Sequence, residues 1–198
     1  MSGNNHGNDT LPALSKRISK GDKYFPADFL KRLYLEVDSL RDRTYIMYHA
    51  ETGLRVSDVL ASEWVHVDWQ ACRTYTYDEK KDQWRYVYWP PFVKAQLKMY
   101  LVSTQQNGQA GRLLFPFSDK TANRIIKRWC KRLQFPYASM VGTHWLRHTY
   151  VRLSRKAGRD IKAVQANTGD TIKTILEWYS DLSAEDLAAE VRKPLTDY

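Results

Sequence analysis

The chain has 198 residues, 43% of them hydrophobic and 27% charged, a balance that is ordinary for a single globular domain. None of its apolar runs approaches the ~20 residues that a bilayer span needs, so we expect no membrane protein. The formal net charge is +9, which is typical of proteins that neutralise nucleic-acid phosphates but does not by itself assign a function.

The first 23 residues are polar and rich in Gly and Asn, and they contain no apolar signal-peptide core. We therefore predict a flexible N-terminal arm over residues 1–23. The two cysteines, Cys72 and Cys130, lie far apart and outside any metal-ligand spacing, which predicts two reduced thiols. We expect neither a metal site nor a cofactor.

The segment after the arm has the pattern of three short helices. Apolar residues at helical spacing predict a first helix over residues 26–40, and a second follows over residues 42–52. Gly53 suits the left-handed cap that ends a helix, and Ser57 can cap the start of a third one. Residues 54–56 are then an elbow between helices.

Residues 73–89 favour strands. The stretches TYTY and WRYVYW flank the charged sequence DEKKDQ, which predicts a β-hairpin with Lys80 and Lys81 at its tip. Pro90 and Pro91 end the second strand, and helical spacing resumes over residues 92–102.

The rest of the chain is predicted to be helical. Ser118 or Asp119 can cap a helix that runs to about residue 133 and has one apolar and one basic face. Thr143 can cap a helix over residues 144–157, and Asp160 can cap a short one that ends at Gly169. A further helix is expected over residues 172–179, and an amphipathic tail begins at Ser183. The pattern predicts a mostly α-helical α+β domain with a small antiparallel sheet.

Three side chains have the chemistry needed at a phosphate. Arg55 lies in TGLRVSD, where the elbow leaves its fork-shaped guanidinium free for a bidentate contact. His144 and Arg147 lie three positions apart in THWLRH, so on a helix they project from the same face and can converge on one anion.

The motifs TGLRVSD, HWLRH and TGD followed by WY together resemble the tyrosine recombinase (integrase) family, which includes Xer-like enzymes and phage integrases. The spacings of 23 positions from Arg147 to Asp170 and of 9 from Asp170 to Tyr179 are similar to those of the family. The resemblance implies the family's catalytic-domain fold over residues 24–198, without the N-terminal core-binding domain that most members have.

The resemblance also implies the roles of the site residues. Arg55 and Arg147 would clamp the scissile phosphate, His144 would transfer a proton or donate a hydrogen bond, and Tyr179 would attack to leave a 3′-phosphotyrosyl bond. Lys80 or Lys81 would protonate the leaving 5′ oxygen, and Lys81 is favoured because it lies nearer the second strand. Such a transesterification needs neither ATP nor a metal.

Asp170 departs from the family, which usually has a histidine or tryptophan at this position to donate a hydrogen bond to the phosphate. At ~4 Å from a phosphate and an effective dielectric near 20, an ionised carboxylate would cost about 4 kcal/mol, or roughly a thousandfold in rate. Asp170 could pair with Arg147 or Arg55, accept the proton of Tyr179, or turn away while Thr171 or Lys173 supplies the donor. A weakened active site is a further alternative.

The resemblance implies site-specific DNA recombination, with double-stranded DNA as partner, self-association into tetramers on DNA and a cytoplasmic, nucleoid-associated location. An isolated domain can be monomeric, and topoisomerase activity could be a side reaction. The alternative is a non-catalytic regulator, because residues 160–179 also have the pattern of a helix-turn-helix. That alternative leaves the two arginines, His144 and the lysine-tipped hairpin unexplained.

Overall fold

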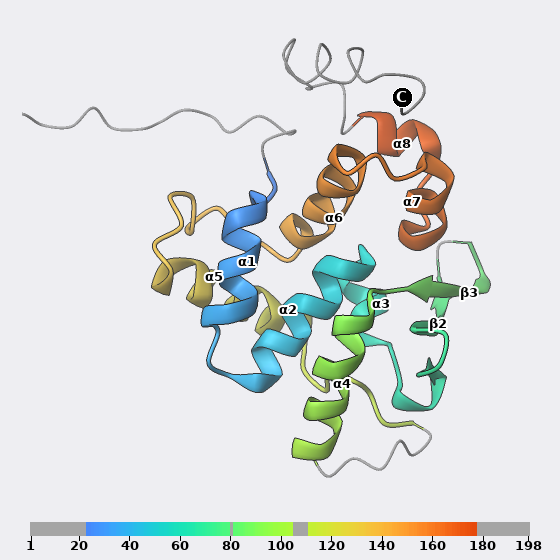
Figure 1. Ribbon diagram of the computed structural model, residues 1–198, viewed down its shortest axis with the longest axis horizontal. Coiled ribbons are helices and arrows are strands. Elements are labelled where there is room, and N and C mark those ends of the chain that lie inside the picture. Colours follow the sequence, from blue (N-terminus) through green and yellow to red (C-terminus); the bar gives the residue numbers. More distant parts are fainter. Residues whose placement is uncertain (1–22, 80, 105–110, 178–198) are drawn as a thin grey trace, which may run out of the picture.

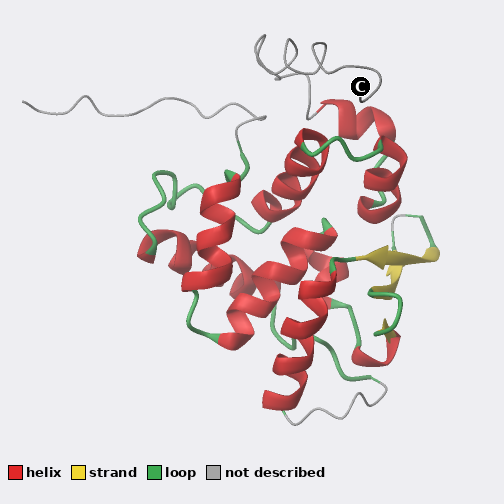
Figure 2. Ribbon diagram, viewed as in Figure 1, coloured by secondary structure: helices red, strands yellow, loops and turns green. Residues whose placement is uncertain are grey.

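The computed structural model describes residues 23–79, 81–104 and 111–177. This part of the chain is mostly helical, with one three-stranded antiparallel sheet at its edge (Figures 1 and 2). The predicted α+β fold with a small antiparallel sheet is confirmed. None of the helices in these ranges combines the length and the apolar character needed to cross a membrane.

The first two helices are α1 (Ala27–Glu36) and α2 (Leu40–Thr52). The prediction of one helix to residue 40 is wrong, because Val37 is extended and Ser39 already caps α2 by accepting the backbone N–H of Asp42. α2 lies at the centre of the fold between α1 and α4 (Figure 1). It is buried along most of its length, so it forms the base on which the elbow is placed.

The third helix, α3 (Val56–Leu60), begins two residues earlier than a Ser57 cap requires. Arg55 is extended and occupies the capping position, where its carbonyl accepts the N–H of Val59 at 3.0 Å. Ser57 lies inside the helix and donates its hydroxyl to Asp58 Oδ1 at 3.1 Å. The predicted Ser57 cap is therefore wrong, although the elbow between the two helices is present.

The sheet follows a short 3₁₀ helix, η2 (Trp64–His66), and consists of β1 (Val67–Asp68), β2 (Arg73–Asp78) and β3 (Gln83–Tyr88). The strands are antiparallel in the order β1-β2-β3. The predicted hairpin is confirmed as β2 and β3. β1 was not predicted, because two residues are too short to show a strand pattern.

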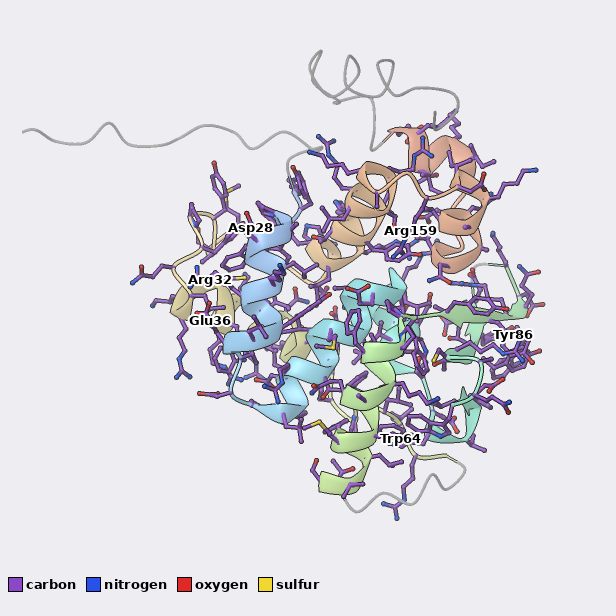
Figure 3. All side chains as sticks on the ribbon, in the orientation of Figure 1. Asp28, Arg32, Glu36, Trp64, Tyr86 and Arg159 are labelled. Carbon is purple, nitrogen blue, oxygen red and sulfur yellow. The ribbon has the colours of Figure 1, made fainter. Side chains whose placement is uncertain are left out.

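The two faces of the hairpin differ. Its outer face carries aromatic rings that contact one another and are half exposed, such as Tyr86, which points away from the helices (Figure 3). The inner face is buried against the helices and consists of Thr74, Thr76, Asp78, Arg85 and Val87. Two charged residues therefore point into the protein from this sheet.

Two further helices pack against this part of the fold: α4 contacts α2, and α5 contacts α3. α4 (Pro91–Ser103) begins at a proline, and α5 (Asp119–Arg132) begins after Ser118, which accepts the N–H of Thr121 at 3.3 Å. The predicted serine cap of α5 is confirmed. The fully buried Asp42 of α2 accepts the Trp129 indole N–H of α5 at 2.9 Å, which ties the two helices together.

The last three helices are α6 (His144–Lys156), α7 (Ile161–Thr168) and α8 (Ile172–Glu177). Asp160 caps α7 as predicted. The predicted Thr143 cap is wrong, because Thr143 is itself helical and its side chain makes no capping bond. α7 lies against β3 (Figure 1), so the turn after α7 faces the elbow region.

The structure has one main hydrophobic core between the helices and the inner face of the sheet. A cluster of aromatic rings joins its N-terminal side to α6, where Phe25 contacts Trp145 with ring centroids 5.5 Å apart. Cys72 and Cys130 are both free thiols, as predicted. The expected arm, the end of the last expected helix at Tyr179 and the tail from Ser183 lie outside the described residues.

Candidate active site

The elbow between α2 and α3 depends on Gly53. Its φ is +65°, in the left-handed region that favours glycine. A Cβ at this position would lie 2.3 Å from Cδ1 of Tyr150, so a side chain would also collide with α6. Gly53 therefore ends α2 and lets α6 approach the elbow closely.

Two side chains hold the carbonyl groups of the elbow. Arg147 Nη1 donates to Gly53 O at 2.7 Å, and His49 Nε2 lies 3.1 Å from Leu54 O. Because a carbonyl can only accept, Nε2 of His49 carries the proton and Nδ1 accepts the hydroxyl of Tyr45 at 3.1 Å. Burial lowers the pKa of His49 to about 3, so its ring is neutral at pH 7.

Arg147 projects from the first turn of α6 into the protein, and only 11% of its side chain is exposed. Besides Gly53 O, it donates from Nη2 to Thr168 O at 3.0 Å, at the end of α7. Its Nη2 also lies 2.5 Å from Asp170 Oδ2. Burial lowers the pKa of Arg147, but an arginine remains charged.

Asp170 joins the two arginines. Its Oδ1 accepts Nη2 of Arg55 at 2.9 Å, while its Oδ2 meets Arg147. Of the arrangements left open for Asp170, the structure shows the one in which it pairs with both guanidinium groups. Thr171 instead caps α8 by accepting the N–H of Thr174 at 3.1 Å. Two guanidinium groups that share one carboxylate can also share one phosphate, since both anions present paired oxygens.

The cluster extends to the inner face of the hairpin. Arg55 Nη1 lies 3.6 Å from Asp78 Oδ1 and 4.0 Å from Asp58 Oδ2, and Arg85 Nε lies 3.4 Å from Asp78 Oδ2. Burial raises the pKa of Asp58. In total three arginines face three aspartates, so the ionised cluster is electrically neutral.

His144 is exposed at the first position of α6, and its ring centroid is 5.4 Å from that of His148. Within the described residues, the hydrogen-bond acceptors of Arg55 and Arg147 are Asp170, Gly53 O and Thr168 O, and not His144. Desolvation and the positive charge of Lys23 lower the pKa of His144, which favours a neutral imidazole.

The structure shows only one of the remaining expected site residues. Lys81 is exposed in the turn between β2 and β3, where its N–H donates to Asp78 O at 3.0 Å. Lys80 and Tyr179 lie outside the described residues.

Several residues that hold the cluster in place were not predicted from the sequence, among them Arg85, Asp78, His49 and Asn167. The Asn167 amide pairs with the backbone of Tyr88, accepting its N–H at 2.8 Å and donating to its C=O at 2.7 Å. Strand alternation would have placed Arg85 and Asp78 on the inner face of the hairpin, had its register been known. No local pattern marks His49 or Asn167.

Comparisons with known proteins identify the family and the fold. The pattern of the phage integrase family matches residues 23–186. The XerA recombinase has a similar fold, with a TM-score of 0.74 and 24% identity over 88% of this chain and 66% of that one. The catalytic domain of bacteriophage HP1 integrase matches with a TM-score of 0.58 and 17% identity, over 87% of this chain and 95% of that domain.

A XerH site-specific recombinase bound to its difH substrate matches with a TM-score of 0.63 and 18% identity, over 84% of this chain and 52% of that one. The chain thus spans less than two thirds of the XerA and XerH chains. No curated protein matches the sequence. The family match covers most of the chain and the fold is that of its structural relatives, so the chain belongs to the phage integrase family, as a tyrosine recombinase catalytic domain.

Proposed function

We propose that this protein is a site-specific DNA recombinase that cuts and rejoins DNA through a 3′-phosphotyrosyl bond to Tyr179. The observation that carries the proposal is the meeting of Arg55 and Arg147 on one carboxylate. A phosphodiester has two nonbridging oxygens that can take the place of the two carboxylate oxygens. The relatives that were crystallised with DNA, XerH and the Tn1549 integrase, support double-stranded DNA as the partner.

The two arginines would stabilise the negative charge that develops on the phosphate during the reaction. Both guanidinium groups are held before DNA binds, so little reorganisation is needed when the charge develops. The phenol of Tyr179, with an ordinary pKa near 10, must lose its proton as it attacks. The arginine pair makes this easier, because it favours negative charge at the reacting centre.

In the proposed cleavage step, Oη of Tyr179 forms a bond to phosphorus while the bond from phosphorus to the 5′ oxygen breaks. The neutral ring of His144 accepts the phenolic proton or donates a hydrogen bond to the phosphate. Lys80 or Lys81 gives a proton to the leaving 5′ oxygen. A 5′-hydroxyl of a partner strand then reverses the reaction, so the phosphodiester energy is conserved without ATP or a metal.

Asp170 would act as an internal counterion in the DNA-free protein. It pairs with both arginines and holds their guanidinium groups at one point. Since the ionised cluster is already neutral, an entering phosphate must displace the carboxylate or be repelled by it. We propose that the turn carrying Asp170 moves aside when DNA binds, and that the protein assembles as a tetramer on its DNA site.

The experiment is covalent capture of DNA. The protein is incubated with a library of nicked duplexes of random sequence, in which cleavage releases a short strand and prevents religation. We expect a protein-DNA adduct that survives denaturation, and sequencing of the captured strands would give the target site. Tyr179→Phe should form no adduct, while it should still bind the selected duplex.

Tyr137→Phe is a matched control, since Tyr137 is half exposed in the loop between α5 and α6. It should form the adduct at the wild-type rate. The absence of an adduct with every member of the library, combined with sequence-specific binding, would contradict the proposal and support the DNA-binding regulator. The pair α7 and α8 would then be its DNA-reading element.

A further inference from the structure

Arg85 lies where three parts of the site meet. It projects from the inner face of β3, and 11% of its side chain is exposed. Its Nη1 donates to the carbonyls of Ala166 and Asn167 at 2.9 and 2.8 Å. These carbonyls belong to the last turn of α7, where a cation is favoured by the helix dipole. Arg85 thus fastens β3 to the end of α7, just before the turn that carries Asp170.

The same guanidinium reaches the second strand of the hairpin. Nε of Arg85 lies 3.4 Å from Oδ2 of Asp78, whose other oxygen lies 3.6 Å from Arg55. Asp78 is almost fully buried. A Cβ on Gly169 would lie 2.5 Å from Asp78 Oδ2 and 3.1 Å from Nη2 of Arg85, so the ion pair is packed directly against the turn after α7.

The lysine-bearing turn begins at this ion pair. Asp78 is the last residue of β2, and its carbonyl accepts the N–H of Lys81 at 3.0 Å. The hydroxyl of Tyr77, the residue before Asp78 in β2, donates to Asp82 at the far end of the turn. A shift of Asp78 would therefore also move the turn that carries Lys81.

We propose that Arg85 is a positioning residue that sets the lysine-bearing turn relative to the two phosphate-binding arginines. It does so by hydrogen-bonding the end of α7 through its Nη1 and by forming an ion pair with Asp78. The inference rests on the proposed function, in which a lysine of this turn protonates the leaving 5′ oxygen. Displacement of a reacting group by about 1 Å can cost roughly a hundredfold in rate.

The variants must remove the contacts of Arg85 with Asp78 and with the end of α7 without leaving an unpaired buried charge. Arg85→Met alone would leave the buried carboxylate of Asp78 with Arg55 as its remaining cation, whereas replacing a buried ion pair by neutral groups of similar size is often close to neutral for stability. The main variant is therefore Asp78→Asn with Arg85→Met. Arg85→Lys is a second variant that keeps the charge and loses the fork. Thermal unfolding checks that both are folded.

The measurement compares two leaving groups on the captured target duplex. One substrate has the ordinary 5′ oxygen at the scissile phosphate and the other has sulfur in its place. A thiolate leaves without protonation, because thiols have a pKa of about 8.5, so only the oxygen substrate needs the lysine. The ratio of the two single-turnover rates reports how well the general acid is placed.

We expect the double variant to react about 100-fold more slowly with oxygen and within about threefold of wild type with sulfur. Arg85→Lys should show the same pattern with a smaller loss. Replacing both Lys80 and Lys81 by alanine should reproduce the pattern. Arg73→Met, on the outer face of the same hairpin, should leave both rates unchanged.

An oxygen-to-sulfur ratio equal to that of wild type would overturn the inference, whether both rates fall together or neither falls. If Arg85 had a purely structural role, the rates on the oxygen and sulfur substrates would fall by the same factor. If wild type forms no adduct with either substrate, the proposed function itself fails, and the inference fails with it. The two failures are therefore distinguishable.

Discussion

The two arginines that share Asp170 are held in different ways. Arg147, from α6, donates to two backbone carbonyls, Gly53 O and Thr168 O, in addition to its ion pair with Asp170. Among the residues that the structure describes, the partners of Arg55, from the elbow, are carboxylates, and 28% of its side chain is exposed. Arg147 is therefore anchored by neutral carbonyl acceptors, whereas Arg55 is held by ion pairs with carboxylates.

This difference separates two tasks that both need a guanidinium group. Carbonyls satisfy the N–H groups of Arg147 without neutralising its charge, so it joins the elbow to α7 and still attracts an anion. The carboxylates around Arg55 compete with any phosphate that approaches it. We therefore expect Arg147 to matter for stability and binding together, and Arg55 to matter mainly for binding.

The largest expected effect comes from Arg147→Met. The change leaves two carbonyls without their donor and Asp170 with a single cation. We expect the free energy of unfolding to fall by about 3 kcal/mol, measured by urea denaturation. Arg124→Met, on the exposed side of α5, is the control and should change it by less than about 0.5 kcal/mol. An effect no larger than that of the control would contradict the anchoring role.

The second prediction concerns the pH dependence of stability that arises from His49, whose ring contacts the elbow at Leu54 O. The folded protein keeps this ring neutral with a pKa of about 3, whereas the unfolded chain protonates it near 6.5. The stabilisation is thus complete above pH 6.5 and is lost as the pH falls toward 3. We expect a slope of up to about 1.4 kcal/mol per pH unit in this window.

His49→Gln should remove that slope from urea-denaturation curves recorded between about pH 4 and 6.5. His144→Gln is the matched control, because the pKa of this exposed histidine is lowered as well but less strongly. It should change the slope less. An unchanged slope in His49→Gln would show that the elbow does not depend on a neutral ring.

A third, smaller effect is expected at the shared carboxylate. Asp170→Asn removes the charge that a phosphate must displace, so adduct formation should become about tenfold faster, which is about 1.4 kcal/mol. Single-turnover rates on the captured duplex measure it. Asp38→Asn makes the same change in net charge at an exposed ion pair and should leave the rate unaltered. A slower Asp170→Asn enzyme would mean that the carboxylate is needed during the reaction.

The smallest effect on stability is expected for Arg55→Met. Asp170 keeps Arg147 as a partner and Asp78 keeps Arg85, so the loss should be about 1 kcal/mol or less, although the adduct should disappear. Urea denaturation and the capture assay measure the two properties on one sample. A loss as large as that of Arg147→Met would remove the distinction between the two arginines.

Local patterns in the sequence predicted much of this molecule. The αL glycine at Gly53, the Asp160 cap and the alternating strands of the hairpin depend on residues close in the chain, so they can be read from the sequence. The start of α6, by contrast, is held by a nonlocal bond. The N–H of Thr143 donates to Asn123 Oδ1 of α5 at 3.1 Å, and no pattern near Thr143 indicates this partner.

By itself, the sequence determined the family motifs, the two arginines and the departure at Asp170, because these depend on residue identity and spacing. Only the tertiary structure decided what Asp170 contacts, and that the hairpin supplies Arg85 and Asp78 to the same cluster. The reason is physical: buried charges find their partners across elements far apart in the chain, and no local pattern records which of them meet.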